Sequence, residues 1–153
     1  MAITIAIEDP LQDDVRTLVA SLNDYLLKLT PPEFCFHLTV EQMAEPDVTV
    51  WIARDNGRAI GCGALKRHDS RIAEVKRMFT HEEYRGQGVG RRILGEIVNA
   101  ALEEGIEDLV LETGDRHHAA WAIYEKAGFI RCGPVLDYPD SGHSIFYHKQ
   151  LAA

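Results

Sequence analysis

The sequence predicts an α/β protein built on one mixed, mostly antiparallel sheet with helices on both faces. Three observations support this fold class: a β-hairpin signal at Asn56-Gly57, two helical segments that each stop at a glycine, and the order of elements along the chain. That order, β-α-α-β-β-β-α-β-α-β-β, suits a mixed sheet covered on both sides. The chain has 153 residues and 46% hydrophobic composition, so we expect a single domain over residues 1–153.

The N-terminal third is expected to hold one strand and two helices. Residues 3–9 (ITIAIED) are β-branched and alternating, as in a strand. Asp9 and Pro10 are expected to cap and begin a helix that runs to about Lys28. The paired prolines of TPPEF end this helix, and the Thr-x-x-Gln pattern in LTVEQMAEP predicts a second, short helix. Apolar residues recur at helical spacing along the first helix: Leu11, Val15, Leu18, Val19, Leu22, Leu26 and Leu29.

Three consecutive antiparallel strands are predicted next. Two strand-like runs flank Asn56-Gly57, a pair that tolerates positive φ at both central positions of a type I′ turn. A third run, RIAEVKRMFT (71–80), follows after the short HDS link. Successive side chains of a regular strand point to opposite faces of the sheet. We therefore expect one face to carry Ile72, Glu74, Lys76, Met78 and Thr80, and the opposite face to carry Ala73, Val75, Arg77 and Phe79.

The C-terminal half is expected to hold two helices and three strands. A loop at residues 81–88 leads into an amphipathic helix that stops at Gly105, a usual C-terminal position for glycine. Residues 107–113 (EDLVLET) predict a buried strand, and residues 115–128 predict a second amphipathic helix ended by Gly128. Residues 129–135 (FIRCGPV) and 144–151 (SIFYHKQL) are expected to be the last strands.

Charge and composition exclude several classes of partner. The formal net charge of −8 argues against nucleic acid, which requires a basic face, although it leaves room for a local anion site. Cys35, Cys62 and Cys132 are odd in number, with no CxxC pair, and are expected to be buried reduced thiols. The N-terminus does not resemble a signal peptide and no run approaches 18 apolar residues, so we expect a cytoplasmic protein without a membrane partner.

The segment RGQGVG (85–90) combines three glycines with flanking arginines. A simple turn would need one glycine, whereas bare backbone N–H groups at a helix N-terminus favour an anion such as a phosphate or pyrophosphate. A P-loop is excluded because Gly90 is followed by Arg91 and Arg92 instead of Lys-Ser/Thr. A Rossmann fingerprint is excluded because the sixth position counted from Gly86 is Arg91.

The pattern that fits is Arg/Gln-x-x-Gly-x-Gly/Ala, with Arg85, Gly88 and Gly90. Here the sequence resembles the GCN5-related N-acetyltransferase (GNAT) superfamily, over MFTHEEYRGQGVGRRIL and again in AAWAIYEKAGF, which is similar to a later motif of that family. The resemblance runs from Ile3 to Leu151, with the N-terminal third matched by pattern only. The sequence also resembles a narrower group of small bacterial N-acetyltransferases, and this likeness implies small-molecule substrates. It is carried by GCGALKRHDSRIAEVKRMFTHEEYRGQGVG, LETG and CGPVLDY.

The resemblance implies the GNAT acyl-CoA N-acyltransferase fold, with acetyl-CoA as co-substrate. The family binds the cofactor's pyrophosphate on the backbone amides of this loop, and its central strand binds the pantetheine arm like an added strand. A backbone N–H of that strand also holds the oxyanion. His117 takes the place of an asparagine that in many relatives contacts the arm, and Thr80 stands where an aliphatic residue is common. The implied cofactor residues are Met78, Phe79, Thr80, Arg85, Gly86, Gln87, Gly88, Val89, Gly90, Arg91 and His117.

Acyl transfer to an amine requires a base and an acid, because an alkylamine of pKa ~10 is protonated at neutral pH. Tyr124 occupies the family's tyrosine position and is the expected acid that protonates the leaving thiolate; the alternative is a core aromatic. Glu74, on the same predicted face as Met78, is the expected base; the alternative is a solvent-facing carboxylate paired with Lys76. No metal is expected, since adjacent residues His117 and His118 do not face one another on a helix.

Three functions compatible with the resemblance stay open. The first is direct acetyl transfer, through a tetrahedral intermediate, to the amine of a small molecule or amino-acid-like acceptor. The others are a non-catalytic acyl-CoA-binding sensor and a protein or peptide amine acetyltransferase; the presence of both Glu74 and Tyr124 favours an enzyme. Residues 30–38 (TPPEFCFHL), Lys76, Arg77 and residues 137–143 (DYPDSGH) are expected to border the acceptor, and the two cationic side chains hint at an anionic group on it. A homodimer is possible, since dimers are common in the family.

Overall fold

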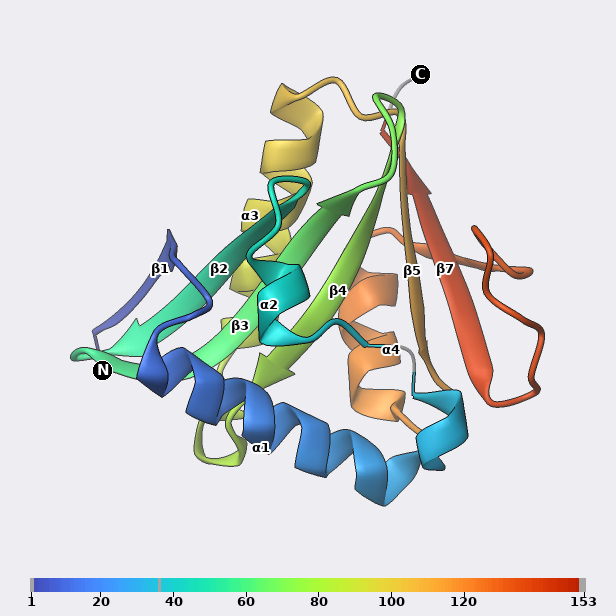
Figure 1. Ribbon diagram of the computed structural model, residues 1–153. Helices are drawn as coiled ribbons and strands as arrows, with labels where there is room; N and C mark the ends of the chain where they lie inside the picture. The colour runs from blue at the N-terminus through green and yellow to red at the C-terminus, as the bar shows by residue number, and fades with distance from the viewer. Residues whose placement is uncertain (1, 36, 152–153) are drawn as a thin grey trace.

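The computed structural model describes residues 2–35 and 37–151, which form a seven-stranded sheet with helices on both faces (Figure 1). The strand order is β1-β2-β3-β4-β5-β7-β6, and every neighbouring pair is antiparallel except β4 and β5. This confirms the predicted fold class and element order. The strands are β1 (Ile3–Ile7), β2 (Val48–Asp55), β3 (Arg58–Arg67), β4 (Ile72–Thr80), β5 (Asp108–Gly114), β6 (Ile130–Cys132) and β7 (Ser144–Gln150).

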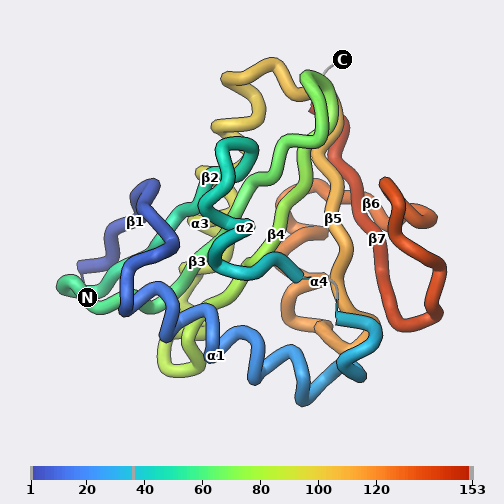
Figure 2. Tube along the Cα trace, viewed as in Figure 1, coloured from blue at the N-terminus to red at the C-terminus, as the bar shows by residue number. Residues whose placement is uncertain are grey.

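The helices lie in two layers, and a separate core fills the space between each layer and the sheet. In Figure 1, α1 (Asp13–Leu29) and α2 (Val40–Met43) cross in front of the sheet, and α3 (Val89–Glu103) and α4 (His118–Lys126) lie behind it. Leu22 and Ile52 are among the fully buried side chains of the front core, and Ile93 and Tyr147 among those of the rear core. Figure 2 shows the first strand, β1, at one edge of the sheet and the last strand, β7, toward the other.

Several local predictions are confirmed because short-range chemistry decides them. Asn56 and Gly57 both have positive φ, at 48° and 90°, as the hairpin turn between β2 and β3 requires. Thr39 Oγ1 accepts from the Gln42 backbone N–H at 3.1 Å while Gln42 Oε1 accepts from the Thr39 N–H at 2.9 Å, which completes the capping box of α2. Gly105 follows the end of α3 with φ 77°.

Two expectations about the N-terminal part and the thiols need correction. The first helix begins at Asp13, after an N-cap at Gln12, and not at Asp9 and Pro10. The Asp9 carboxylate accepts instead from the Leu11 N–H at 2.9 Å, which stabilises a turn before the helix. The three cysteines are unpaired, as expected, but only Cys62 is buried, whereas Cys35 and Cys132 are half-buried.

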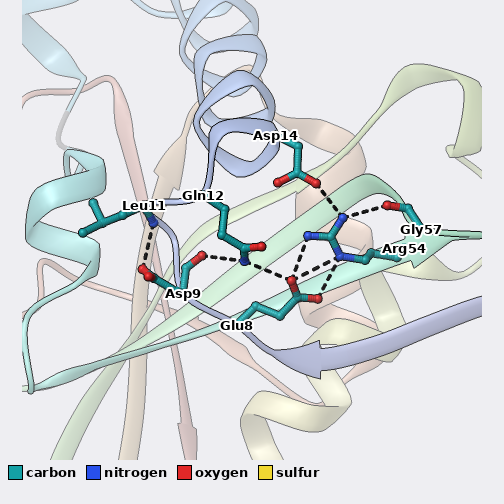
Figure 3. Close-up of polar contacts among 7 residues, drawn as sticks. All are labelled: Glu8, Asp9, Leu11, Gln12, Asp14, Arg54 and Gly57. Atoms are coloured by element: carbon teal, nitrogen blue, oxygen red, sulfur yellow. Dashed lines mark hydrogen bonds and ion pairs between the residues drawn. The ribbon is translucent and has the colours of Figure 1, made fainter.

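Arg54 ties the start of α1 to the β2–β3 hairpin (Figure 3). Its guanidinium donates to the Glu8 carboxylate at 2.8 and 2.9 Å, to Asp14 Oδ2 at 2.6 Å and to the Gly57 carbonyl at 2.7 Å. Hydrogen bonding to Arg54 lowers the pKa of both carboxyl groups, and burial of Glu8 opposes this only in part. The cluster therefore stabilises the fold only while both carboxyl groups are ionised.

We expect Arg54→Gln to lower the free energy of unfolding in urea by about 2 kcal/mol at pH 7, because charged hydrogen bonds are lost. Since the folded-state pKa values of Glu8 and Asp14 are depressed, the difference from wild type should shrink as the pH falls through them. Arg16→Gln removes the same charge from an exposed pair with Glu41 and serves as the control, with an effect of at most about 0.5 kcal/mol. Equal losses in the two variants would contradict the role of the cluster.

A β-bulge in β4 overturns the regular alternation predicted for that strand. Cys62 pairs with Phe79 and Ala64 pairs with Lys76, so two residues of β4 lie opposite one residue of β3. Arg77 is the bulged residue, with φ 56°. Before the bulge Val75 packs in the rear core, and after it Phe79 packs in the front core, although regular alternation would place both on one face.

The bulge changes which side chains meet. Met78 packs in the rear core, whereas Glu74 and Lys76 point with the front face toward α1. The prediction that Glu74 and Met78 share a face is therefore wrong, because the extra residue reverses the alternation after Arg77. For the same reason Lys76 and Arg77, predicted on opposite faces, line one cavity.

Among residues 2–35 and 37–151, no helix is both long enough and apolar enough to cross a membrane.

Candidate functional site

The site lies where the two parallel strands of the sheet separate. β4 and β5 pair only from Ile72 to Glu74 and from Asp108 to Val110, and beyond this point both strands continue without pairing to each other. Two cavities occur here, a larger one of about 540 Å³ and a smaller one of about 130 Å³. They adjoin, since the same four residues contribute to both walls: Tyr25, Met78, Ala120 and Tyr124.

The larger cavity collects most of the residues predicted to bind the cofactor. Gln87 and His117 are not among its lining residues; the Gln87 side chain donates to the Glu83 carbonyl at 3.4 Å instead. The predicted residues that line it are Met78, Phe79, Thr80, Arg85, Gly86, Gly88, Val89, Gly90 and Arg91.

The glycine loop presents backbone donors at the N-terminus of α3. Gly88 is the N-cap of this helix, with φ 83°, and its carbonyl accepts the first helical hydrogen bond, from Arg92, at 3.1 Å. The N–H groups of residues 89–91 precede that bond, so they have no partner within the helix. Arg85 adds a fixed cation, because its Nε donates to the Thr80 carbonyl at 3.0 Å and its guanidinium lies 4.4 Å from the centre of the Tyr25 ring. This wall suits a pyrophosphate.

We expect Gly88→Ala to weaken acetyl-CoA binding about tenfold, because a left-handed conformation costs an L-residue about 1–2 kcal/mol and the loop must shift to avoid it. Isothermal titration calorimetry with acetyl-CoA measures the change. Gly95→Ala is the matched control, since Gly95 lies inside α3 with no atom near its added methyl group. An unchanged dissociation constant for Gly88→Ala would contradict the role assigned to the loop.

Tyr124 lies at the junction of the two cavities. It projects from α4, only 6% of its surface is exposed, and its ring contacts those of Phe129 and Tyr147 edge-on and tilted. Burial, together with the charge of Glu112, raises the pKa of the Tyr124 hydroxyl, so the hydroxyl keeps its proton at neutral pH. Within the described part of the chain this hydroxyl has no hydrogen-bond partner. Tyr124 is thus a core aromatic, and its role as the acid stays a prediction.

Glu74 is buried, with 2% of its surface exposed, so it does not face solvent as the alternative predicted, although its predicted pair with Lys76 is present. Its carboxylate lies 2.9 Å from His68 Nε2, accepts from the Tyr138 hydroxyl at 2.5 Å and from Lys76 Nζ at 3.3 Å. Burial alone would raise the pKa of Glu74, but the His68 hydrogen bond, the Lys76 charge and the Tyr138 hydrogen bond outweigh it and lower that pKa. A carboxylate held in this way is a weak proton acceptor.

A second carboxylate, Glu112 on β5, lines the smaller cavity and was missed from the sequence. Its one hydrogen bond within the described residues comes from Ser144 Oγ at 2.7 Å. Burial raises the pKa of Glu112, and the nearby charge of Glu74 raises it further, against the Ser144 hydrogen bond and the charge of Lys76. The one signal for it in the sequence is a glutamate inside the run LVLET, and the pattern of that run predicts only a buried strand.

The other predicted acceptor residues reach the smaller cavity to different extents. Lys76 and Arg77 line it, and so do Thr30, Phe34, Cys35 and His37 of the segment 30–38, while Phe36 lies outside the described residues. Residues 137–143 are absent from the lining, although Tyr138 supports it through its hydrogen bond with Glu74. His117 also lines this cavity, with Nε2 3.3 Å from Thr30 Oγ1, so its predicted contact with the cofactor stays a prediction.

Comparison with known proteins gives this site a family context. The model of the acetyltransferase (GNAT) family matches residues 16–129. An IAA acetyltransferase of Azospirillum brasilense is 39% identical over 97% of this chain and 98% of its own. The uncharacterised N-acetyltransferase YsnE of Bacillus subtilis is 36% identical over 89% of this chain and 93% of its own.

Solved structures share the whole fold. A protein of Klebsiella pneumoniae, provisionally described as an acyl-CoA N-acyltransferase, has a TM-score of 0.83 and 27% identity, with 98% of each chain covered. A GNAT family acetyltransferase of Elizabethkingia anophelis, solved with acetyl-CoA bound, has a TM-score of 0.63 and 20% identity, covering 97% of this chain and 98% of that one.

Proposed function

The chain belongs to the acetyltransferase (GNAT) family and is an acetyl-CoA-dependent N-acetyltransferase, and we propose that it acetylates the amine of a small molecule bound in the smaller cavity. The observation that carries the proposal is the position of Tyr124, which lines both cavities. The larger cavity has the anion-binding wall that a CoA pyrophosphate needs. The smaller one, about 130 Å³ in volume, suits a small acceptor better than a protein segment.

In this proposal the bound cofactor supplies an acetyl thioester, an activated acyl group, and the chain's own residues supply the rest. The backbone of Met78–Thr80, beyond the point where β4 and β5 part, donates N–H groups to the negative charge that develops on the acetyl oxygen. Glu112 takes a proton from the acceptor ammonium, directly or through water, so that the amine lone pair can attack. Tyr124 gives its proton to the departing thiolate.

The relative acidities constrain the last step. A phenol of pKa ~10 is a weaker acid than a thiol of pKa ~8.5, and burial raises the pKa of Tyr124 still further. Transfer to the thiolate is therefore uphill unless the thiolate is desolvated as well, which raises its pKa in the same direction. The protonated hydroxyl also stabilises the thiolate by donating a hydrogen bond before the proton moves.

The test is a panel of amines, amino acids and IAA, which is named as the substrate of the Azospirillum relative, each incubated with acetyl-CoA and monitored for release of free CoA. We expect acceptor-dependent release above the rate with acetyl-CoA alone, and a mass increase in the acceptor that matches one acetyl group. Clear acetyl-CoA binding without turnover of any acceptor would favour a non-catalytic acyl-CoA sensor. Turnover restricted to peptides would favour a protein acetyltransferase.

A further inference from the structure

Resting on the proposed function, we propose that Arg77 binds a carboxylate of the acceptor, so that the acceptor is an amino acid and not a simple amine. The charges that the smaller cavity leaves uncompensated indicate the class of substrate that binds there, which the family assignment does not.

Arg77 is a buried cation that has no counter-ion among the residues that the structure describes. Only 6% of its surface is exposed, and it lines the smaller cavity. One terminal nitrogen donates to Asn23 Oδ1 of α1, whereas Nε has no hydrogen-bond partner in the described part of the chain. No carboxylate of the described residues forms an ion pair with this guanidinium. A guanidinium buried in this way is costly unless an anion compensates it, and its planar set of N–H donors matches a carboxylate.

The other ionisable groups of the smaller cavity do not neutralise Arg77. Lys76 is paired with Glu74, so it does not make the cavity positive. Burial and the charges of Arg77 and Lys76 lower the pKa of His37, which keeps that ring neutral at neutral pH. Glu112 has only the Ser144 hydroxyl as a partner within the described residues. One cation, Arg77, and one anion, Glu112, therefore remain, as an amino acid zwitterion requires.

The two charges also differ in their relation to the reacting centre. Arg77 stands on β4 and Glu112 on β5, both beyond the point where these strands stop pairing, so the two charges line the smaller cavity from different strands. Glu112 is on the strand that precedes α4, the helix that carries Tyr124. An amino acid would thus bind with its ammonium toward Glu112 and its carboxylate toward Arg77.

The backbone holds Arg77 in position for this contact. It occupies the β-bulge of β4 with φ 56°, and the Cys62 thiol donates to its carbonyl at 3.1 Å. The bulge turns Arg77 to the same side as Lys76, where regular alternation would have directed it to the rear core. A cation fixed by the sheet costs little ordering when the acceptor binds.

The test compares amino acids with their C-terminal amides, for example those of alanine, serine, methionine and phenylalanine. Each pair keeps the amine and the side chain but differs in the carboxylate charge. We measure kcat/KM for wild type and express it per concentration of unprotonated amine, because the amide lowers the amine pKa. We expect the acid of at least one pair to be preferred by about thirtyfold or more. Equal values for acid and amide in every pair that wild type turns over would overturn the proposal.

Variants then assign any preference to Arg77. Arg77→Gln should lower kcat/KM for the acid much more than for the amide, so that the preference disappears, and Arg77→Lys should retain part of the preference because the charge remains. Arg16→Gln, which removes an exposed charge outside both cavities, is the control and should keep the preference. A preference that survives in folded Arg77→Gln would also overturn the proposal. Circular dichroism checks folding, and if Arg77→Gln does not fold, Arg77→Lys decides, since a preference as large as that of wild type in this variant would overturn the proposal.

A binding measurement separates this proposal from the proposed function. N-acetyl amino acids and their amides, as product analogues, are titrated into the protein–CoA complex, which requires no chemistry. If no acceptor is turned over, the proposed function fails. Tighter binding of the acids to wild type than to the Arg77 variant would still support the carboxylate site, and equal binding of acids and amides would overturn it.

Discussion

Replacement of Tyr124 by phenylalanine is expected to lower kcat by at least about tenfold, since general acid catalysis contributes roughly 10²–10⁴. The dissociation constant of acetyl-CoA should change by no more than about twofold, because the ring still lines both cavities and only the hydroxyl is lost. Steady-state kinetics with the best acceptor of the panel measures the first quantity, and titration calorimetry measures the second.

Tyr147→Phe provides the matched control for Tyr124→Phe. Tyr147 is fully buried, its hydroxyl donates to Glu125 at 2.5 Å, and it lines neither cavity. We expect this variant to lose stability with little change in kcat, so a general effect of removing a buried hydroxyl can be recognised. Unchanged turnover of Tyr124→Phe would remove Tyr124 from the mechanism.

Glu112→Gln is expected to lower kcat/KM by about a hundredfold at pH 7, because the acceptor ammonium loses its base. The pH dependence follows from the raised pKa of Glu112. In wild type, kcat/KM should fall as the pH drops through that pKa, since only the carboxylate accepts a proton. In the variant this step should vanish, and the rate should rise with the unprotonated fraction of the amine, so the deficit narrows at alkaline pH.

Glu74→Gln is the companion variant, because the sequence-based hypothesis assigns the same pH profile to Glu74. The structure gives Glu74 three hydrogen-bonding partners and a lowered pKa, so we expect this variant to lose stability more than it loses the pH-dependent step. If Glu74→Gln shows the neutral-pH deficit with alkaline recovery and Glu112→Gln runs parallel to wild type, the base is Glu74.

The sequence was most informative where neighbouring residues decide the outcome. The turn at Asn56-Gly57, the capping box of Thr39 and Gln42 and the glycine after α3 depend on contacts within a few residues. The glycine loop that caps α3 is also decided by neighbouring residues. Its residue pattern predicts both the family and most of the residues that line the larger cavity.

Features that depend on distant partners were missed. The bulge at Arg77 arises from the pairing of β4 with β3, and no residue in RIAEVKRMFT marks it. Glu112 is half-buried in the wall of a cavity that residues of β4 and of the segment before α2 also line, so its raised pKa cannot be read from LVLET. The first helix begins only at Asp13, because the Asp9 carboxylate accepts from the Leu11 N–H in a turn before the helix and does not cap it.

The central claim is that donor and acceptor bind in two adjoining cavities that meet at Tyr124. A crystal structure with a bisubstrate analogue, in which an amino acid is joined through its nitrogen and an acetyl bridge to the sulfur of CoA, tests it most directly. We predict the pyrophosphate on the backbone of residues 86–91, the bridging sulfur beside the Tyr124 hydroxyl and the amino acid in the smaller cavity. A pyrophosphate bound away from the loop, or an amino acid portion outside that cavity, would contradict the account.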